Sequence, residues 1–195
     1  AGLLVGELSS IHGPGQWLLT LPLPIGISFY TFHGISLLVD TLRLGKLQSV
    51  DDETARNGFG RHLGHTFLYL TFFPQLVAGP IAKAHFFYPQ IGAKPFSGID
   101  WQTAIKCLIV GYFLKMVVAD NLQHQTIWIA YPYFLHFPLA NLAGFLFAYS
   151  MQIFADFAGY SLIAAGLAAL FGYRLPQNFN FPYISQSVTE FWKRW

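Results

Sequence analysis

Apolar segments punctuated by proline, glycine and charge run along the chain. The segment at 21–43 is apolar from Ile25 to Val39 and closes on Asp40 and Arg43. It is slightly shorter than the about 20 residues of a typical membrane-spanning helix, and we expect it to be partly buried in protein. The segment at 63–83 is also apolar, but Pro74, Gly79 and Pro80 interrupt it, so one continuous helix is not expected there.

Two later segments predict longer helices. Residues 101–121 have good helix formers with cations on their flanks, and 138–174 is the longest apolar run. A straight helix over 138–174 would exceed about 50 Å, against about 30 Å of hydrocarbon, so we expect it to break, tilt steeply or form two helices, with Gly159 as the break. Small residues four apart predict close helix packing: Ala140, Gly144 and Ala148, then Ala164, Ala168 and Gly172.

The polar stretches between these segments predict a topology. Residues 43–62 carry four cations and are expected on the cytoplasmic side, whereas 122–137 has no Lys or Arg and is rich in Trp and Tyr. With 101–121 as a span, both ends of 63–83 lie on one side, which predicts a re-entrant hairpin. Non-helical backbone at membrane depth is tolerated where it lines a cavity, so the pattern predicts an internal chamber.

Composition supports the membrane interpretation. Charged residues make up 10% and hydrophobic residues 54% of the 195 residues, whereas ordinary soluble proteins have about 25% charged residues. The net charge of +2 does not indicate a nucleic-acid partner, and the single Cys107 excludes an internal disulfide. The chain begins with Ala1 and ends on aromatic residues and cations, so we interpret 1–195 as one membrane domain truncated at both ends.

Several motifs carry a resemblance to a known family. They are "LPIGISFYTFHGISLLVD", "FFPQLVAGPI", "FYPQI", "KMVVADNL" and "DFAGYSLIAAGLAALFGYRLPQNFNFPYISQSVTEFWKRW". In this order they resemble the membrane-bound O-acyltransferase family, in particular its alginate O-acetyltransferase-like branch, from about Leu21 to Trp195. Each motif alone is weakly specific, whereas their combination in a membrane-type chain is strongly specific.

The resemblance implies an all-α, polytopic bundle of membrane helices with re-entrant or broken helices around a central funnel. It implies a multi-pass protein of the bacterial inner membrane that moves an acetyl group from a cytoplasmic donor toward hydroxyls of an exported polysaccharide such as alginate. Acetyl-CoA or another acetyl donor would be the cosubstrate, with no bound cofactor. The implied partners are membrane lipid, the polysaccharide acceptor and periplasmic accessory acetylation proteins.

The family's active-site histidine directly follows the pair that is here Arg194-Trp195. The resemblance therefore implies that no catalytic residue lies within the chain and that the fragment alone is inactive. Leu162 follows "GYS", where the alginate branch commonly has an acidic residue and the teichoic-acid D-alanyl transfer branch tolerates Leu. That D-alanyl branch is one alternative, and a transporter or a non-catalytic membrane scaffold is another, because broken helices and a buried Asp also occur in transporters.

Asp156 is the sharpest candidate for a functional side chain. It is the one formal charge between Asn121 and Tyr173, and a carboxylate in mid-membrane costs about 2.5–3.5 kcal/mol on insertion scales, so it faces a cavity or a partner. A hydrogen bond to a neighbouring helix, or a cap at the Gly159 break, would satisfy the same cost. Arg174, Lys193 or Arg194 could pair with Asp156 only if the chain folds back.

The last residues combine polar and aromatic side chains. Ser187 and Glu190 match a capping box, which predicts a helix running to Trp195. It is either an interfacial helix with a Trp anchor and snorkelling cations, or the element that delivers the expected histidine to the chamber. In the second case Lys193 and Arg194 would lie near the donor's phosphates. Asn178 and Asn180 are candidate hydrogen-bonding residues of the chamber.

The histidines within the chain predict neither a base nor a metal ligand. His33 lies in an apolar segment, and we expect a structural polar contact there rather than catalysis. The other histidines fall in loops or at segment ends, and no pair has metal-ligand spacing beside a carboxylate, so we expect no metal. Asp40 and Asp120 close apolar helices and are interpreted as boundary residues.

Overall fold

The described part of the chain folds as helices alone. The computed structural model describes residues 26–44, 58–76 and 79–195, and these contain α-helices, short 3-10 helices and one π-helix but no strand. The α-helices are α3 (Ile27–Leu44), α5 (Phe59–Thr71), α6 (Ala84–Phe87), α7 (Trp101–Tyr112), α8 (Asp120–Thr126), α9 (Leu139–Leu170) and α10 (Val188–Arg194). The all-α expectation is confirmed. The polar loop expected at 44–62 falls largely on 45–57, outside the described residues.

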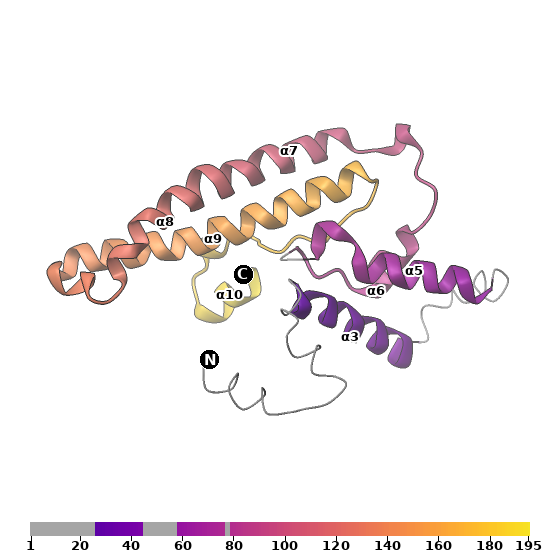
Figure 1. Cartoon of the computed structure of the whole chain (residues 1–195), viewed down its shortest axis with the longest axis horizontal. Coiled ribbons are helices and arrows are strands. Elements are labelled where there is room, and N and C mark those ends of the chain that lie inside the picture. The colour runs from indigo at the N-terminus through magenta and orange to yellow at the C-terminus, as the bar shows by residue number, and fades with distance from the viewer. Residues whose placement is uncertain (1–25, 45–57, 77–78) are drawn as a thin grey trace, which may run out of the picture.

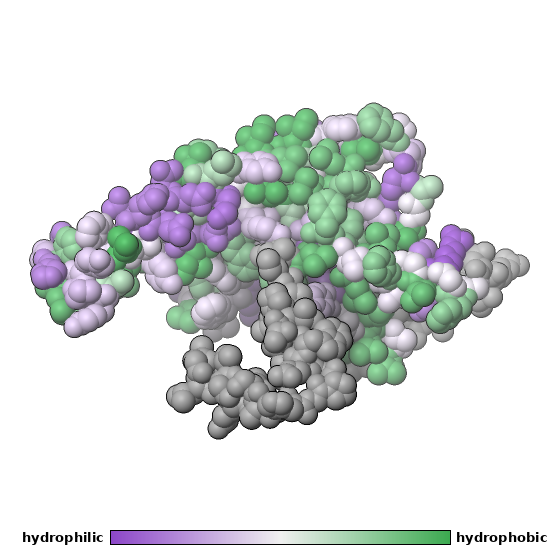
Figure 2. Space-filling model, viewed as in Figure 1, coloured by the Kyte–Doolittle hydropathy of each residue, from purple (hydrophilic) through white to green (hydrophobic). Residues whose placement is uncertain are grey.

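Two long antiparallel helical stretches form one layer (Figure 1). α7, the π-helix η4 (Phe113–Ala119), α8 and the 3-10 helix η5 (Ile127–Ile129) run on as one stretch, and α9 returns beside it. Among the described residues, these stretches, Trp101–Ile129 and Leu139–Leu170, are long and apolar enough to cross a membrane. The outer face is hydrophobic over α7, whereas hydrophilic residues gather over α8 (Figure 2).

The expected break at Gly159 is wrong. α9 is continuous over 32 residues, which corresponds to about 48 Å. Gly159 instead lets two backbones touch: a Cβ there would lie 2.8 Å from the Lys115 nitrogen and 2.9 Å from the Gly111 oxygen. Gly111 and Gly166 make equally close contacts across the same seam. Glycine is required here by the approach of a second helix rather than by a kink.

The predicted packing by small residues is half right. Ala164 and Ala168 are buried, at 2% and 0% exposure. Ala140 is exposed, and a Cβ at Gly144 would meet nothing within 4 Å. The close approach involves the C-terminal half of α9, because the glycine and alanine positions of α7 lie opposite that half.

A second layer, formed by α3, α5 and α6, lies beside the end of α9 (Figure 1). Its core is a cluster of buried aromatic side chains. Four of them come from this layer and the 3-10 turns beside it, and one, Tyr173, comes from the segment after α9: Tyr69, Phe72, Phe87, Tyr88 and Tyr173. The rings of Phe87 and Tyr173 are stacked with centroids 5.1 Å apart. Aromatic packing therefore joins the two layers.

The expected interruption of 63–83 is confirmed. α5 ends at Thr71, a 3-10 helix follows at Phe73–Gln75, and irregular backbone leads from Gly79 to α6. A Cβ at Gly79 would overlap the Gln75 Cα, so only glycine fits at this position. Whether this segment re-enters a membrane stays a prediction.

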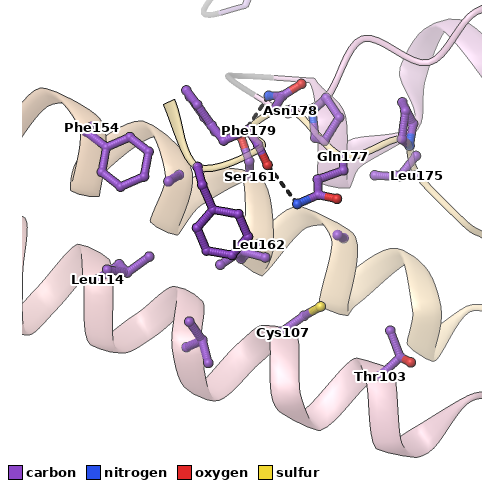
Figure 3. A pocket seen from close by; sticks show the side chains of 16 residues that line it. Thr103, Cys107, Leu114, Phe154, Ser161, Leu162, Leu175, Gln177, Asn178 and Phe179 are labelled. Carbon is purple, nitrogen blue, oxygen red and sulfur yellow. Dashed lines mark hydrogen bonds between the residues drawn. The ribbon is translucent and has the colours of Figure 1, made fainter. Parts of the chain in front are cut away.

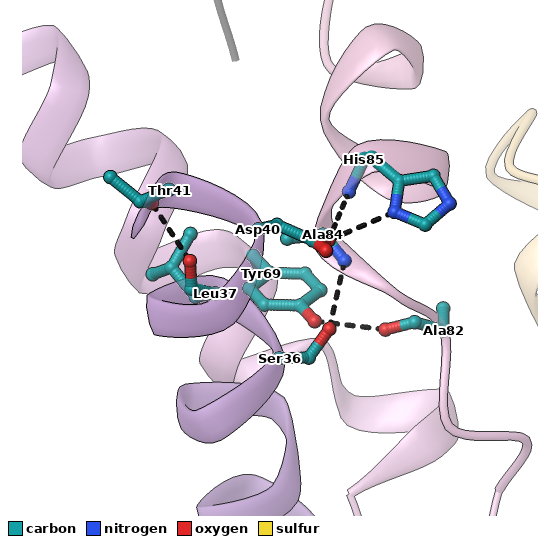
Figure 4. A network of polar contacts seen from close by, with 8 residues as sticks. All are labelled: Ser36, Leu37, Asp40, Thr41, Tyr69, Ala82, Ala84 and His85. Carbon is teal, nitrogen blue, oxygen red and sulfur yellow. Dashed lines mark hydrogen bonds and ion pairs between the residues drawn. The ribbon is translucent and has the colours of Figure 1, made fainter. Parts of the chain in front are cut away.

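α3 has its polar face inward (Figure 4). Ser36 accepts a hydrogen bond from the Ala84 amide at 3.3 Å, and Asp40 accepts one from the His85 amide at 3.0 Å. Asp40 thus joins α3 to α6, which is more than the helix-boundary role expected. Large apolar side chains such as Leu38 and Leu42 are exposed on the other side, at 62% and 82%. This inverts the pattern of a helix on a water-soluble protein and suits a lipid or protein environment.

His33 lies on the same inward face but does not make the polar contact expected. It is 1% exposed, and neither ring nitrogen has a hydrogen-bond partner among the described residues. Its ring instead packs edge-on against Tyr69, with centroids 5.5 Å apart. The aromatic environment of α5 explains this arrangement, because the ring edge of a histidine can pack against an aromatic face.

The contact between α7 and α9 predicts opposite effects for two alanine substitutions on one helix. Gly159→Ala should destabilise the protein by about 1–3 kcal/mol, because the new Cβ overlaps the α7 backbone. Gly144→Ala should be neutral or stabilising by up to about 1 kcal/mol, because Gly144 faces open space and alanine favours a helix. Thermal unfolding of both variants in detergent measures this, and equal melting temperatures would contradict the close contact.

The aromatic core predicts a cost for removing one hydroxyl. The Tyr69 hydroxyl donates to the Ala82 carbonyl at 2.8 Å in a fully buried position. Tyr69→Phe leaves that carbonyl unsatisfied and should lower the free energy of unfolding by about 1 kcal/mol. Tyr131→Phe is the matched control, since Tyr131 is 79% exposed. A Tyr69→Phe protein as stable as the control would show that this hydrogen bond contributes nothing.

Candidate functional site

A cavity of about 620 Å³ lies between α7, α9 and the segment after α9 (Figure 3). Residues Thr103, Cys107, Val110 and Leu114 line it from the first helical stretch, and Phe154, Ala158, Ser161, Leu162 and Ala165 line it from α9. The third wall comes from residues 175–179 and Phe181. The lining is largely apolar, with a few polar groups at one side, as is common in ligand-binding pockets.

The cavity lies beside the seam where the two helices touch. On α7, the cavity residues 103, 107 and 110 each precede a seam residue, Ala104, Leu108 or Gly111. On α9, the cavity residues 158, 162 and 165 likewise precede Gly159, Ile163 and Gly166. One residue turns a helix by about 100°, so the same pair of helices presents a sealed face and a cavity face side by side.

The polar side of the cavity comes from the segment after α9. Asn178 donates a hydrogen bond from Nδ2 to the Ser161 hydroxyl at 2.8 Å, and Gln177 donates from Nε2 to the Phe179 carbonyl at 2.7 Å. The first bond fixes the Asn178 amide against α9, and the second fixes the Gln177 amide within its own segment. Among the described residues, neither amide oxygen is used as an acceptor in these two bonds. The arrangement can hold a polar group at one side of a mostly apolar space.

Local sequence explains the path of this segment. α9 ends where Gly172 adopts a φ of +75°, a left-handed conformation that suits glycine. Pro176 and Pro182 interrupt the backbone after α9, so that no α-helix forms over 173–187 and only a short 3-10 helix lies at Pro182–Ile184. Phe181 has a φ of +46°, which is rare for an aromatic residue and turns the chain back toward α10.

The predicted capping box starts α10. The Ser187 hydroxyl accepts from the Glu190 amide at 3.1 Å, which confirms the helix start. The Glu190 carboxylate reaches back to the Gln186 amide at 2.9 Å rather than to Ser187. These bonds lower the pKa of Glu190, the Gln186 amide first and the Arg194 guanidinium second.

α10 places Trp195 against the wall of the cavity. Its ring centroid lies 5.2 Å from that of Phe179 and 5.9 Å from that of Phe154, and both of these residues line the cavity. Trp195 therefore points inward, and it is separated from the cavity by one layer of aromatic rings. Lys193 is exposed, and Arg194 is held by Glu190 and by the Asn180 carbonyl.

Asp156 has a partner that the sequence analysis did not name. Lys115 Nζ lies 2.5 Å from Asp156 Oδ1 and 3.3 Å from Asp120 Oδ1, whereas Arg194 pairs with Glu190. Asp156 does not line the cavity, although Asn178 does. Of the five candidates, the structure brings Asn178 to the cavity and Trp195 to its wall, and it places Asp156 in an ion pair between η4 and α9.

A signal for the Lys115–Asp156 pair is present in the sequence. Lys115 is the lone charge between Lys106 and Asp120, and Asp156 is the lone charge of the next long apolar segment. Opposite charges isolated in neighbouring spans pair to offset the cost of burial. Ser161, Thr103 and Cys107 carry no comparable signal, since their role depends on which face of each helix meets the cavity.

The described residues hold no group of three or more His, Cys, Asp or Glu side chains that could bind a metal ion. His85 lies close to a carboxylate, with Nδ1 3.0 Å from Asp40 Oδ2, but this pair belongs to the α3–α6 contact rather than to the cavity.

Three curated proteins show what the chain is similar to. It is 33% identical over 98% of its length to the probable alginate O-acetylase AlgI of Pseudomonas aeruginosa, and covers 34% of that protein. It is 30% identical over 91% to the peptidoglycan O-acetyltransferase of Helicobacter pylori, and covers 36% of it. It is 28% identical over 94% to the teichoic acid D-alanyltransferase of Bacillus subtilis, and covers 44% of it. No protein-family model matches the chain.

The chain thus spans between about a third and under half of the length of these curated relatives. Similarity extends over nearly all of its residues, and the relatives at 30–35% identity are acyl-transferring proteins by name. The motifs and the continuous similarity agree, and the chain belongs to the membrane-bound O-acyltransferase family.

Proposed function

We propose that this chain is part of a membrane O-acyltransferase that moves an acetyl group from a cytoplasmic donor toward hydroxyls of an exported polysaccharide such as alginate. The observation that carries the proposal is the position of Trp195 against Phe154 and Phe179, two residues of the cavity wall. The residue that follows Trp195 in the family is the active-site histidine. A histidine at that place would lie near the cavity, where apolar walls exclude water.

The chemistry requires a base and a site for the reacting groups. The histidine takes the proton of the acceptor hydroxyl, whose oxygen then attacks the acetyl carbonyl while the donor's thiol or alcohol leaves and receives the proton. Asn178 lies on the polar side of the cavity and orients one of the reacting groups through its amide oxygen. Lys193 is exposed beside Trp195 and attracts the phosphates of a donor such as acetyl-CoA.

Asp156 serves this site indirectly. Its ion pair with Lys115 ties η4 to α9 next to the seam, so the pair stabilises the two helices that form the cavity.

We further propose a multi-pass protein of the bacterial inner membrane, with helices around a cytoplasmic funnel. The exposed apolar faces of α3 and α7 support this arrangement. Periplasmic proteins that complete the transfer to the polymer are the proposed partners.

A second candidate is D-alanyl transfer to teichoic acid. Leu162 favours it, because this apolar residue lines the cavity where the alginate branch commonly has an acid. The similarity to the Bacillus subtilis teichoic acid D-alanyltransferase supports it at a lower identity of 28%. A non-catalytic scaffold or a transporter remains the alternative if no acyl transfer occurs.

The proposed base gives a direct test in the full-length protein. Changing the histidine expected after Trp195 to alanine should lower kcat about 10²–10⁴-fold, because a general base contributes that much. The measurement is transfer of radiolabelled acetyl groups to an uronate polymer by membranes carrying the protein. His136→Ala is the matched control, since His136 is exposed at the end of the 3-10 helix Tyr133–His136 and does not line the cavity, and it should keep full activity. Undiminished transfer in the histidine variant would refute the mechanism.

A second assay distinguishes acetyl transfer from D-alanyl transfer. Purified full-length protein should label a polyuronate with acetyl groups and should not label teichoic acid with D-alanine from a charged carrier protein. D-alanyl transfer in place of acetyl transfer would favour the second candidate. No transfer in either assay would favour the scaffold or the transporter.

A further inference from the structure

Arg194 joins α10 to the cavity wall at two points. The Asn180 amide donates to the Arg194 carbonyl at 2.8 Å, and Arg194 Nη1 donates to the Asn180 carbonyl at 3.2 Å. Backbone and side chain of one arginine thus bind both backbone groups of one residue, 14 positions earlier in the chain. Such a reciprocal pair fixes distance and orientation together.

Glu190 holds the arginine in place. Arg194 Nε donates to Glu190 Oε1 at 2.8 Å, while the other carboxylate oxygen accepts from the Gln186 amide at 2.9 Å. The guanidinium uses two edges of its planar fork, one for the carboxylate and one for the carbonyl. A lysine has the charge but not this fork, so it cannot make both bonds in the same geometry.

The Arg194–Asn180 hydrogen bonds fix a segment whose neighbouring residues line the cavity. Asn180 lies between Phe179 and Phe181, and both of these side chains line the cavity. Phe179 contacts Trp195 ring to ring. Phe181 is held in a left-handed conformation, with a φ of +46°, which persists only where surrounding contacts impose it. The two hydrogen bonds between Arg194 and Asn180 supply such contacts at the residue just before Phe181.

We propose that Arg194 is a positioning residue, which sets where Trp195 and the residue after it stand relative to the cavity by clamping α10 to Asn180. This inference rests on the proposed function, because the position after Trp195 is the one assigned to the base. Arg194 does not touch the reacting atoms. It acts through the backbone of α10, and its loss should misplace the reacting groups without removing a contact to either substrate.

The test compares Arg194→Gln and Arg194→Lys with Arg61→Gln in the full-length protein. Arg61 is an exposed arginine on α5 and serves as the matched control. We expect Arg194→Gln to lower kcat about 10- to 100-fold, since a misplacement of about 1 Å can cost that much, with both KM values within about twofold. Arg194→Lys should lower kcat by a similar factor, because charge alone does not restore the fork. Arg61→Gln should leave kcat unchanged.

Hydrogen exchange of the 176–195 region provides a readout that does not depend on activity. Faster exchange of the Asn180 amide in both Arg194 variants, at an unchanged melting temperature, would support the clamp. If these variants do not fold, Glu190→Gln replaces them, since its amide oxygen still accepts from Gln186 but loses the charge that holds Arg194, and a lower kcat is expected.

Three results would overturn the proposal. One is full kcat in Arg194→Lys, which would show that charge suffices. Another is a raised donor KM at constant kcat, which would assign Arg194 to the donor's phosphates. The third is unchanged exchange of the Asn180 amide in every variant. If wild-type protein shows no acyl transfer but the exchange changes as expected, the proposed function fails while the clamp stands.

Discussion

The backbone contact between α7 and α9 is the constraint on which the rest of the described structure depends. Glycines at 111, 159 and 166 let the two helices approach until main-chain atoms of one meet those of the other. Helices this close have no room for side chains between them, so the next face of each helix opens away from the seam. The cavity occupies that opening, and the Lys115–Asp156 pair lies at the edge of the same seam.

The cavity then depends on a third element to close it. The segment after α9 crosses the opening, and its amides bind α9 through Ser161 and the chain itself through the Phe179 carbonyl. Aromatic rings extend this wall to Trp195. Hydrogen bonds set the position of this segment and ring packing fills the space behind it, so the polar groups stand at one side and the remaining lining stays apolar. This division suits a site that excludes water from a polar reaction.

Much of the fold was predictable because the patterns are local. The interruption of 63–83, the helix at 101–121 and the capping box at Ser187 follow from proline, periodicity and hydrogen-bonding residues within a few positions. The break at Gly159 was predicted wrongly for a related reason: local sequence cannot distinguish a glycine that bends a helix from one that receives a neighbour. The same limit explains why the close packing predicted at Gly144 does not occur: Gly144 has the four-residue spacing of a packing glycine, but no helix backbone lies against it.

By itself the sequence determined the class of the protein: apolar helices with few charges, in an order of motifs that belongs to one family, with Asp156 and Trp195 as notable residues. Only the tertiary structure decided what those residues contact. Lys115 pairs with Asp156 because η4 packs beside α9, although the two residues lie far apart in the chain. Trp195 faces the cavity because its ring packs against Phe154 of α9. Pairing across such distances depends on which helix faces meet, and that is fixed by packing rather than by any one segment.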